Sequence, residues 1–158
     1  MSDANSFVGA GWHWPLTTDQ TGAVALVRGA DELEQATYLI LATNPGERPM
    51  RPEFGARLRQ FVFASGDATT AGLIGAEVQS ALARWEPRVT VEQVDITTDP
   101  DDPATLWIDI GYTVRSTNDR RNLVFPFYVI PEHEDAVAQQ QAENSPGALT
   151  TAGPAGRR

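Results

Sequence analysis

The sequence has no cysteine, no lysine and only two histidines among its 158 residues. Without cysteine, a disulfide framework, a thiolate nucleophile and a thiolate metal site are all excluded. The HExxH, GxSxG, P-loop and GxGxxG patterns do not occur either, so the common signatures of metalloproteases, serine hydrolases and nucleotide-binding proteins are missing. These absences lower the expectation of an enzyme, and we predict neither a cofactor nor a metal site.

All 12 basic residues are arginines, and 21 acidic residues give a formal net charge of −9. An acidic protein with scattered arginines repels phosphate, so we expect no binding to nucleic acid. No run of residues reaches the roughly 18 apolar positions of a membrane span, and the first residues lack the features of a secretion signal. We therefore expect no membrane insertion and no secretion by a signal peptide.

The length predicts one domain with flanking segments. Residues 1–22 contain Trp12 and Trp14 in a turn-prone stretch, which we interpret as an N-terminal aromatic arm lying over the domain. Residues 23–131 form the predicted domain. Residues 132–158 are rich in Ala, Gln, Gly and Pro, which is typical of a flexible tail.

Apolar residues recur at spacings of three and four in three segments, each of which predicts a helix. The predicted helices are 31–42, a second that begins near Pro52, and a third between Thr69 and Pro87. Asp31 is expected to cap the first, with Glu34 reaching back as a capping box. Pro52 suits a first helical position, and Glu53 beside it complements the positive end of that helix.

Strands are expected on both sides of these helices. A short strand at 23–28 precedes the first helix, and alternation after Arg88 indicates a strand with a bulge near Gln93. Residues 106–114 alternate most clearly, and a final hairpin ends in 123–130, whose Pro126 is typical of a sheet edge. The predicted fold class is therefore α+β: one small domain with about three helices packed on a mostly antiparallel sheet that ends in a C-terminal hairpin.

Carboxylates are the remaining candidates for catalysis, because a glycosidase needs only two acids across a cleft. The candidates are Glu47, Glu53 and Glu86. Each also has a structural explanation, since Glu47 adjoins Arg48, Glu53 lies at a helix start, and Glu86 ends a helix near an arginine. The aspartates at 99–102 are interrupted by proline, which indicates a solvated loop rather than a calcium site.

Glu86, Pro87 and Arg88 place an acid, a rigid proline and a guanidinium where a helix passes into a strand. Proline restricts the backbone, so both charged side chains are presented in a defined direction. They are suited to bidentate pairing with each other or with a partner, and spacing alone favours neither alternative.

Five motifs occur in one order along the chain: Gly11-Trp12, LATNPGER at 41–48, MRPEFG at 50–55, WEPR at 85–88 and NLVFPF at 122–127. Together they resemble the GPW/gene-twenty-five family of baseplate wedge and sheath-initiator proteins. These proteins belong to the contractile tails of phages, type VI secretion systems and other contractile injection systems. The resemblance covers about residues 7–130.

This resemblance implies a structural protein present in six copies per baseplate, built in the bacterial cytoplasm and then part of the contractile particle. The implied partners are the larger wedge subunits, the sheath protein and hub, spike or adaptor proteins. Glu86, Pro87 and Arg88 would dock on the core helical bundle of the wedge subunits and so hold the inner baseplate ring together. The implied loop contacts are Glu47, Arg48, Arg51 and Glu53. The implied strand that templates the first sheath ring contains Leu123, Phe125, Phe127 and Tyr128, and its open edge suits β-augmentation.

We favour a phage-like injection system, because the exclusive use of arginine hints at a GC-rich genome. A type VI baseplate and a phage tail are the alternatives within the family. From a different class, a peptidoglycan-cleaving muramidase is the alternative, since members of the family have carried a tail-lysozyme label. We disfavour it because an adjacent arginine lowers the pKa of a carboxyl group, whereas a general acid needs a raised pKa.

Overall fold

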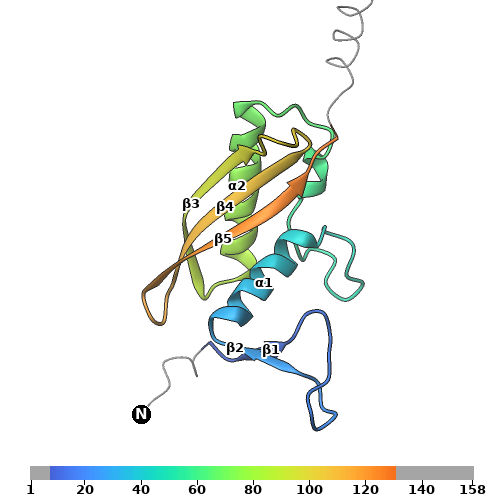
Figure 1. The fold of residues 1–158 in the computed structure, drawn as a ribbon, viewed down its shortest axis with the longest axis vertical. Coiled ribbons are helices and arrows are strands. Elements are labelled where there is room, and N and C mark those ends of the chain that lie inside the picture. The colour runs from blue at the N-terminus through green and yellow to red at the C-terminus, as the bar shows by residue number, and fades with distance from the viewer. Residues whose placement is uncertain (1–7, 131–158) are drawn as a thin grey trace, which may run out of the picture.

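The computed structural model describes residues 8–130, which form two α-helices, one 3-10 turn and two antiparallel sheets (Figure 1). The elements in chain order are β1 (Ala10–Trp12), β2 (Leu26–Arg28), α1 (Ala30–Ala42), η2 (Leu58–Phe61), α2 (Ala68–Trp85), β3 (Val89–Thr98), β4 (Thr105–Val114) and β5 (Asp119–Tyr128). The α+β class and the final hairpin are confirmed. The segment predicted as a flexible tail lies outside the described residues.

The main sheet has the order β3-β4-β5, with both pairs antiparallel, so β4 is the central strand. The predicted bulge is confirmed, because the β3–β4 register shifts between Val91 and Gln93. The long α2 helix runs behind β3 and β4, and α1 lies near β5 (Figure 1). Both outer strands of the sheet have one edge that no described strand covers.

The core lies between the helices and one face of this sheet. The alternation predicted for β4 is confirmed, since Leu106, Ile108, Ile110, Tyr112 and Val114 are all buried. The helices contribute residues at helical spacing, and the most buried are Leu33 and Ile40 of α1 and Ile74, Val78 and Leu82 of α2. Within residues 8–130, no helix is long and apolar enough to cross a membrane.

The two α-helices have different caps. The extent of α1 matches the prediction, but the expected cap is wrong: the N-cap is Gly29 at a φ of 64°, with no side-chain hydrogen bond. Asp31 therefore lies inside the first turn, where a carboxylate favours the helix dipole without capping. In α2, Asp67 is a side-chain cap that accepts the Thr70 N–H at 2.7 Å. The hydrogen bonds from Thr70 lower the pKa of Asp67.

The helix predicted from Pro52 is wrong, because only the four-residue turn η2 forms in this region. The cause is Gly55, which has a φ of 111° and lies against the end of α1. A Cβ added to Gly55 would lie 2.0 Å from the Thr43 carbonyl oxygen, and the next residue, Ala56, donates its N–H to that same oxygen. This contact holds the chain out of a helix. Glu53 consequently lies exposed in a turn and complements no helix start.

The N-terminal arm pairs with the strand that follows it. β1 and β2 are antiparallel, with Trp12 opposite Leu26, and β2 covers only the second half of the strand predicted at 23–28. We call residues 8–28 the arm hairpin. It projects beyond the start of α1 (Figure 1), and Trp12 is 71% exposed.

Candidate functional site

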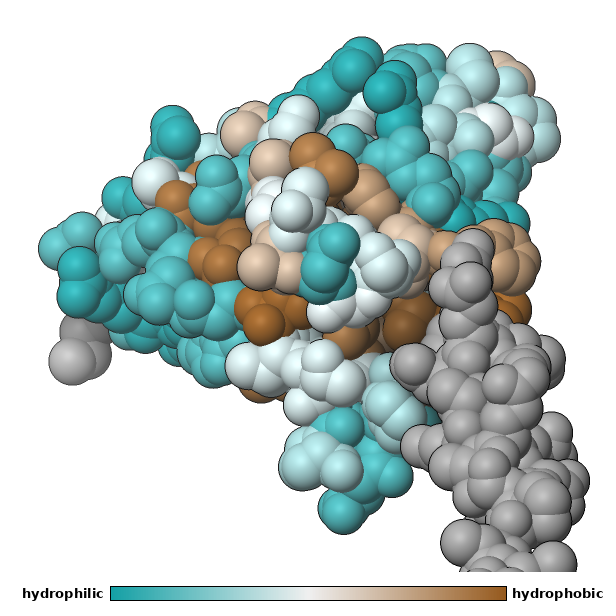
Figure 2. All heavy atoms as spheres, turned by 90° about the horizontal axis from the view of Figure 1, so that it is seen from above, coloured by the Kyte–Doolittle hydropathy of each residue, from teal (hydrophilic) through white to brown (hydrophobic). Residues whose placement is uncertain are grey.

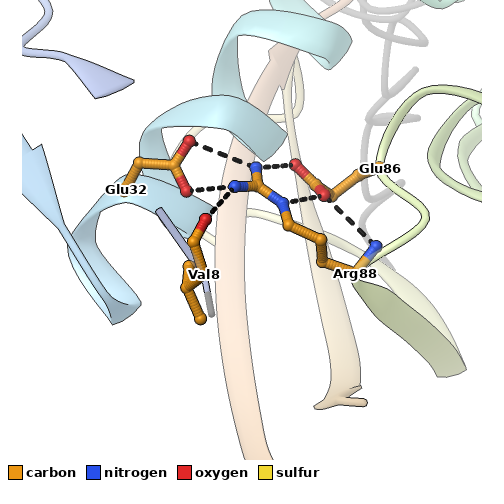
Figure 3. A network of polar contacts seen from close by, with 4 residues as sticks. All are labelled: Val8, Glu32, Glu86 and Arg88. Carbon is orange, nitrogen blue, oxygen red and sulfur yellow. Dashed lines mark hydrogen bonds and ion pairs between the residues drawn. The ribbon is translucent and has the colours of Figure 1, made fainter. Parts of the chain in front are cut away.

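The Arg88 guanidinium is surrounded by acceptors from three separate segments (Figure 3). Its Nε donates to Glu86 Oε1 at 2.6 Å, and its Nη2 donates to the other oxygen of Glu86. Glu32 on α1 accepts from both terminal nitrogens, at 2.6 Å and 3.1 Å. Nη1 also donates to the Val8 carbonyl at 2.8 Å. These contacts, which we call the Arg88 network, use all five N–H donors of the guanidinium.

The acids of the Arg88 network are buried more deeply than the arginine. The side chain of Glu86 is 3% exposed, that of Glu32 is 12% exposed and that of Arg88 is 29% exposed. The hydrogen bonds that Arg88 donates to Glu86, and then those that it donates to Glu32, raise the pKa of Arg88 above its ordinary value, although burial opposes this. A carboxylate as buried as Glu86 would be costly without a cation beside it. Of the two alternatives for the Glu86–Arg88 pair, the structure has the intramolecular one.

Sequence reasoning missed Glu32 and Val8. Both lie far from Arg88 along the chain, at separations of 56 and 80 residues. Glu32 had no distinguishing signal, because an acid in the first turn of a helix is already explained by the helix dipole. The Arg88 network therefore ties the arm hairpin, α1 and the α2–β3 junction together, which the local motif does not reveal.

The loop residues singled out in the sequence do not enter the Arg88 network. Glu47 pairs with Arg59 at 2.9 Å instead of with the adjoining Arg48. The Arg48 guanidinium lies 4.1 Å from the centre of the Phe54 ring. Arg51 and Glu53 are exposed. The loop is nevertheless connected to the neighbourhood of Glu86, because the Phe54 and Trp85 rings pack at 5.3 Å.

The predicted template strand, β5, has a free edge in the described part of the chain. The Val129 N–H donates to Ala104 on the β4 side, whereas the Ile130 N–H donates to Val62 on the other side. Since backbone groups alternate in direction along a strand, the even-numbered residues of β5 present their backbone groups to the free edge. Pro126 is among them, so its missing N–H breaks no bond to β4, and Pro126 removes one donor from the edge.

The side chains of β5 alternate in the same way. Phe125 and Phe127 are buried, Leu123 is half-buried, and Tyr128 is 66% exposed. Three of the four predicted template residues thus face the core, and only Tyr128 faces outward. Val124, which sequence reasoning left out of the template set, is also on the outward face and is 48% exposed.

A groove of about 540 Å³ runs beside this edge. We call it the β5 groove, and it is lined by residues 125–128 of β5 together with residues of α1 and of the segment 56–62. Tyr38 of α1 lies at its end, and the Tyr38 and Phe125 rings pack at 5.3 Å. Figure 2 views the molecule from the top of Figure 1 and shows hydrophobic side chains gathered between hydrophilic ones. The edge of β5 thus has free backbone groups, and the groove beside it is lined in part by apolar side chains.

The acidic run at 99–102 is part of a turn. Asp99 accepts hydrogen bonds from the Asp101 N–H and from Trp107 Nε1, and these lower the pKa of Asp99. Asp102 accepts from the Thr105 hydroxyl at 2.6 Å. Between residues 8 and 130 there is no cluster of three or more histidines and acids that could hold a metal ion.

Comparisons with known proteins find a baseplate wedge protein family and one of its curated members. The family model described as baseplate wedge protein gp25 matches residues 27–119. The baseplate wedge protein gp25 of Enterobacteria phage T4 is 30% identical over 86 residues, which are 54% of this chain. The chain matches 64% of the length of that curated relative.

Two solved structures have a similar fold. One is the crystal structure of a candidate tail lysozyme from Geobacter sulfurreducens, with 43% identity and a TM-score of 0.60, covering 65% of this chain and 92% of that one. The other comes from the baseplate of the anti-feeding prophage, with 20% identity and a TM-score of 0.60, covering 86% and 97%. The family match includes Glu32, Glu86 and Arg88 but neither Val8 nor most of β5.

Proposed function

Because this chain belongs to the family of the baseplate wedge protein gp25, we propose that it is a structural component of a contractile phage tail-like system and that it makes two contacts there. One surface docks on the larger wedge subunits and holds the inner baseplate ring to their core bundle. The other, the free edge of β5, templates the first ring of the sheath.

The docking proposal is supported by the way in which the Arg88 network fixes the backbone around Pro87. Pro87 is exposed between Glu86 and Arg88, both of which are tied down by the network. The guanidinium has no N–H left for a partner, so Arg88 acts by holding this surface in place, and Pro87 with the neighbouring backbone makes the contact. The exposed loop at 47–53 lies next to it through the Phe54–Trp85 contact and adds Glu47, Arg48, Arg51 and Glu53.

The observation that carries the template proposal is the open edge of β5 beside the β5 groove. A strand added there would gain backbone hydrogen bonds from Val124 and Tyr128 and would place alternate side chains in a groove whose lining is mainly apolar but includes Asn44 and Arg59. Pro126 offers a carbonyl but no N–H, so only a strand in the matching register leaves no donor or acceptor unpaired.

We propose that six copies surround a central hub or spike and that the particle is a phage-like contractile injection system assembled in the bacterial cytoplasm. A type VI baseplate or a phage tail is the alternative setting. The six copies agree with the 6-fold symmetry of the anti-feeding prophage baseplate. The exclusive use of arginine, which hints at a GC-rich genome, supports the choice of a phage-like injection system.

A site-specific cross-link tests the template role. The chain has no cysteine, so Tyr128→Cys creates a single attachment point for a benzophenone probe. Irradiation of assembled particles is expected to join position 128 to the sheath protein, identified by mass spectrometry. Leu73→Cys on the outer face of α2 is the matched control and is expected to give no sheath adduct. A sheath adduct from both positions, or from neither, would contradict the proposal.

We further propose that the chain is not a muramidase. The most buried candidate acid, Glu86, has a side chain that is 3% exposed, and both of its carboxylate oxygens accept hydrogen bonds from Arg88, so neither oxygen is presented to a substrate in a cleft. A zymogram on peptidoglycan is expected to show no clearing by the wild type. Clearing that disappears in Glu86→Gln would support the enzyme instead.

A further inference from the structure

A second hollow lies between the arm hairpin, α1 and β5. It has a volume of about 460 Å³ and is lined by Trp14, Pro15, Glu34, Gln35, Tyr38 and Leu123. The arm is attached to α1 at this point, because the Trp14 N–H donates to Gln35 Oε1 at 2.9 Å. We call this hollow the Trp14–Glu34 pocket.

The lining combines aromatic rings with an uncompensated carboxylate. Trp14 and Tyr38 are 55% and 45% exposed, so both rings are accessible to a ligand. Glu34 has no ion pair and no side-chain hydrogen bond with any residue between 8 and 130. Other arginines of the domain are committed elsewhere: Arg88 to Glu32 and Glu86, and Arg121 to Asp119 at 2.8 Å.

This chemistry selects a cation. The faces of indole and phenol rings attract a positive charge, and a nearby carboxylate adds to that attraction. An anionic group would instead be repelled by the carboxylate of Glu34 and by the net charge of −9 of the whole protein. The chain has no lysine, and no arginine of the described residues lines the pocket, so the cation has to come from outside residues 8–130.

We propose that the Trp14–Glu34 pocket receives an arginine or lysine side chain from the segment of a partner protein that adds to β5. This inference rests on the proposed template function. Leu123 of the pocket belongs to β5, and Tyr38 lines both the pocket and the β5 groove. Four residues of strand span about 13 Å, so the partner strand carries its basic residue about four positions from the apolar residue that fills the groove beside Phe127.

The test uses the whole chain and two capped heptapeptides of alternating Val and Thr that differ only at the centre, where one has arginine and the other citrulline. Binding is followed by NMR through the indole N–H signal of Trp14, assigned with Trp14→Phe. The arginine peptide is expected to bind at least about fivefold more tightly than the citrulline peptide, since citrulline keeps the shape but loses the charge.

Glu34→Gln is expected to remove that preference, whereas Asp101→Asn, which changes an exposed carboxylate in the turn at 99–102, is expected to keep it. Equal binding of the two peptides would refute the proposal that the Trp14–Glu34 pocket binds a basic side chain. A preference for the arginine peptide that survives Glu34→Gln would refute it as well. The two proposals fail separately. If the cross-link from position 128 gives no sheath adduct but the arginine peptide still binds more tightly, the pocket is a cation site and the sheath protein is not its partner.

Discussion

Replacing Arg88 by alanine is expected to lower the free energy of unfolding by about 3 kcal/mol and to abolish assembled particles. The substitution removes five hydrogen bonds at once. It also leaves Glu86, which is 2% exposed as a residue, without a cation. A buried charge that has lost its partner typically costs about 3–5 kcal/mol, and the partial exposure of Arg88 places this case at the lower end. Denaturant unfolding of the isolated protein measures the first effect, and electron microscopy of particles measures the second.

A triple variant separates stability from assembly. Glu32→Met, Glu86→Met and Arg88→Met together replace the charges of the Arg88 network by apolar side chains of similar length, and such a replacement is often neutral for stability. We expect this variant to unfold near the wild-type midpoint yet to form few particles, because methionine cannot hold the Val8 carbonyl and α1 in a fixed relation to Pro87. Normal particles from the triple variant would refute the docking role. Wild-type stability of Arg88→Ala would refute the structural role.

The second large effect is expected from Tyr128→Asp, which should leave baseplates intact and prevent sheath growth on them. Tyr128 is exposed on the outward face of β5 and contributes little to the core, so the fold is retained. A strand added to β5 would cover the new carboxylate. Burial of an unpaired charge costs at least about 3 kcal/mol, which is about a hundredfold in affinity. Counting sheathed and bare baseplates in micrographs measures this outcome.

Thr97→Asp is the matched control on the other outer strand of the sheet. Thr97 lies in β3 and is exposed, so the same charge is introduced at an edge to which we assign no partner. We expect normal sheaths and an unchanged melting temperature for this control. Full-length sheaths on Tyr128→Asp baseplates would contradict the template role, as would equal loss of sheaths in both variants.

Local patterns predicted those elements whose partners lie close in the sequence. The extents of α1 and α2, the alternation of β4 and the bulge near Gln93 all follow from the spacing of apolar residues. The helix expected from Pro52 did not form, although its apolar spacing was helical. Gly55 lies against the Thr43 carbonyl, and that tertiary contact outweighs the spacing.

Some features of the candidate site were also predicted from the sequence, whereas others depend on contacts between distant segments. Glu86 and Arg88 are two residues apart, and Pro126 marks β5 as an edge strand, so both features were predicted from the sequence. Whether Arg88 pairs within the chain or with a partner depended on Glu32 and Val8, which only the folded chain brings to it.

By itself, then, the sequence determined the α+β class, the order of the main elements and the family, because apolar periodicity and short motifs are local properties. Only the tertiary structure decided that all five donors of Arg88 are used and that Glu34 faces a pocket with no cation of its own. Hydrogen bonds and ion pairs between distant segments depend on distances of a few ångströms, and those distances exist only after the core has packed.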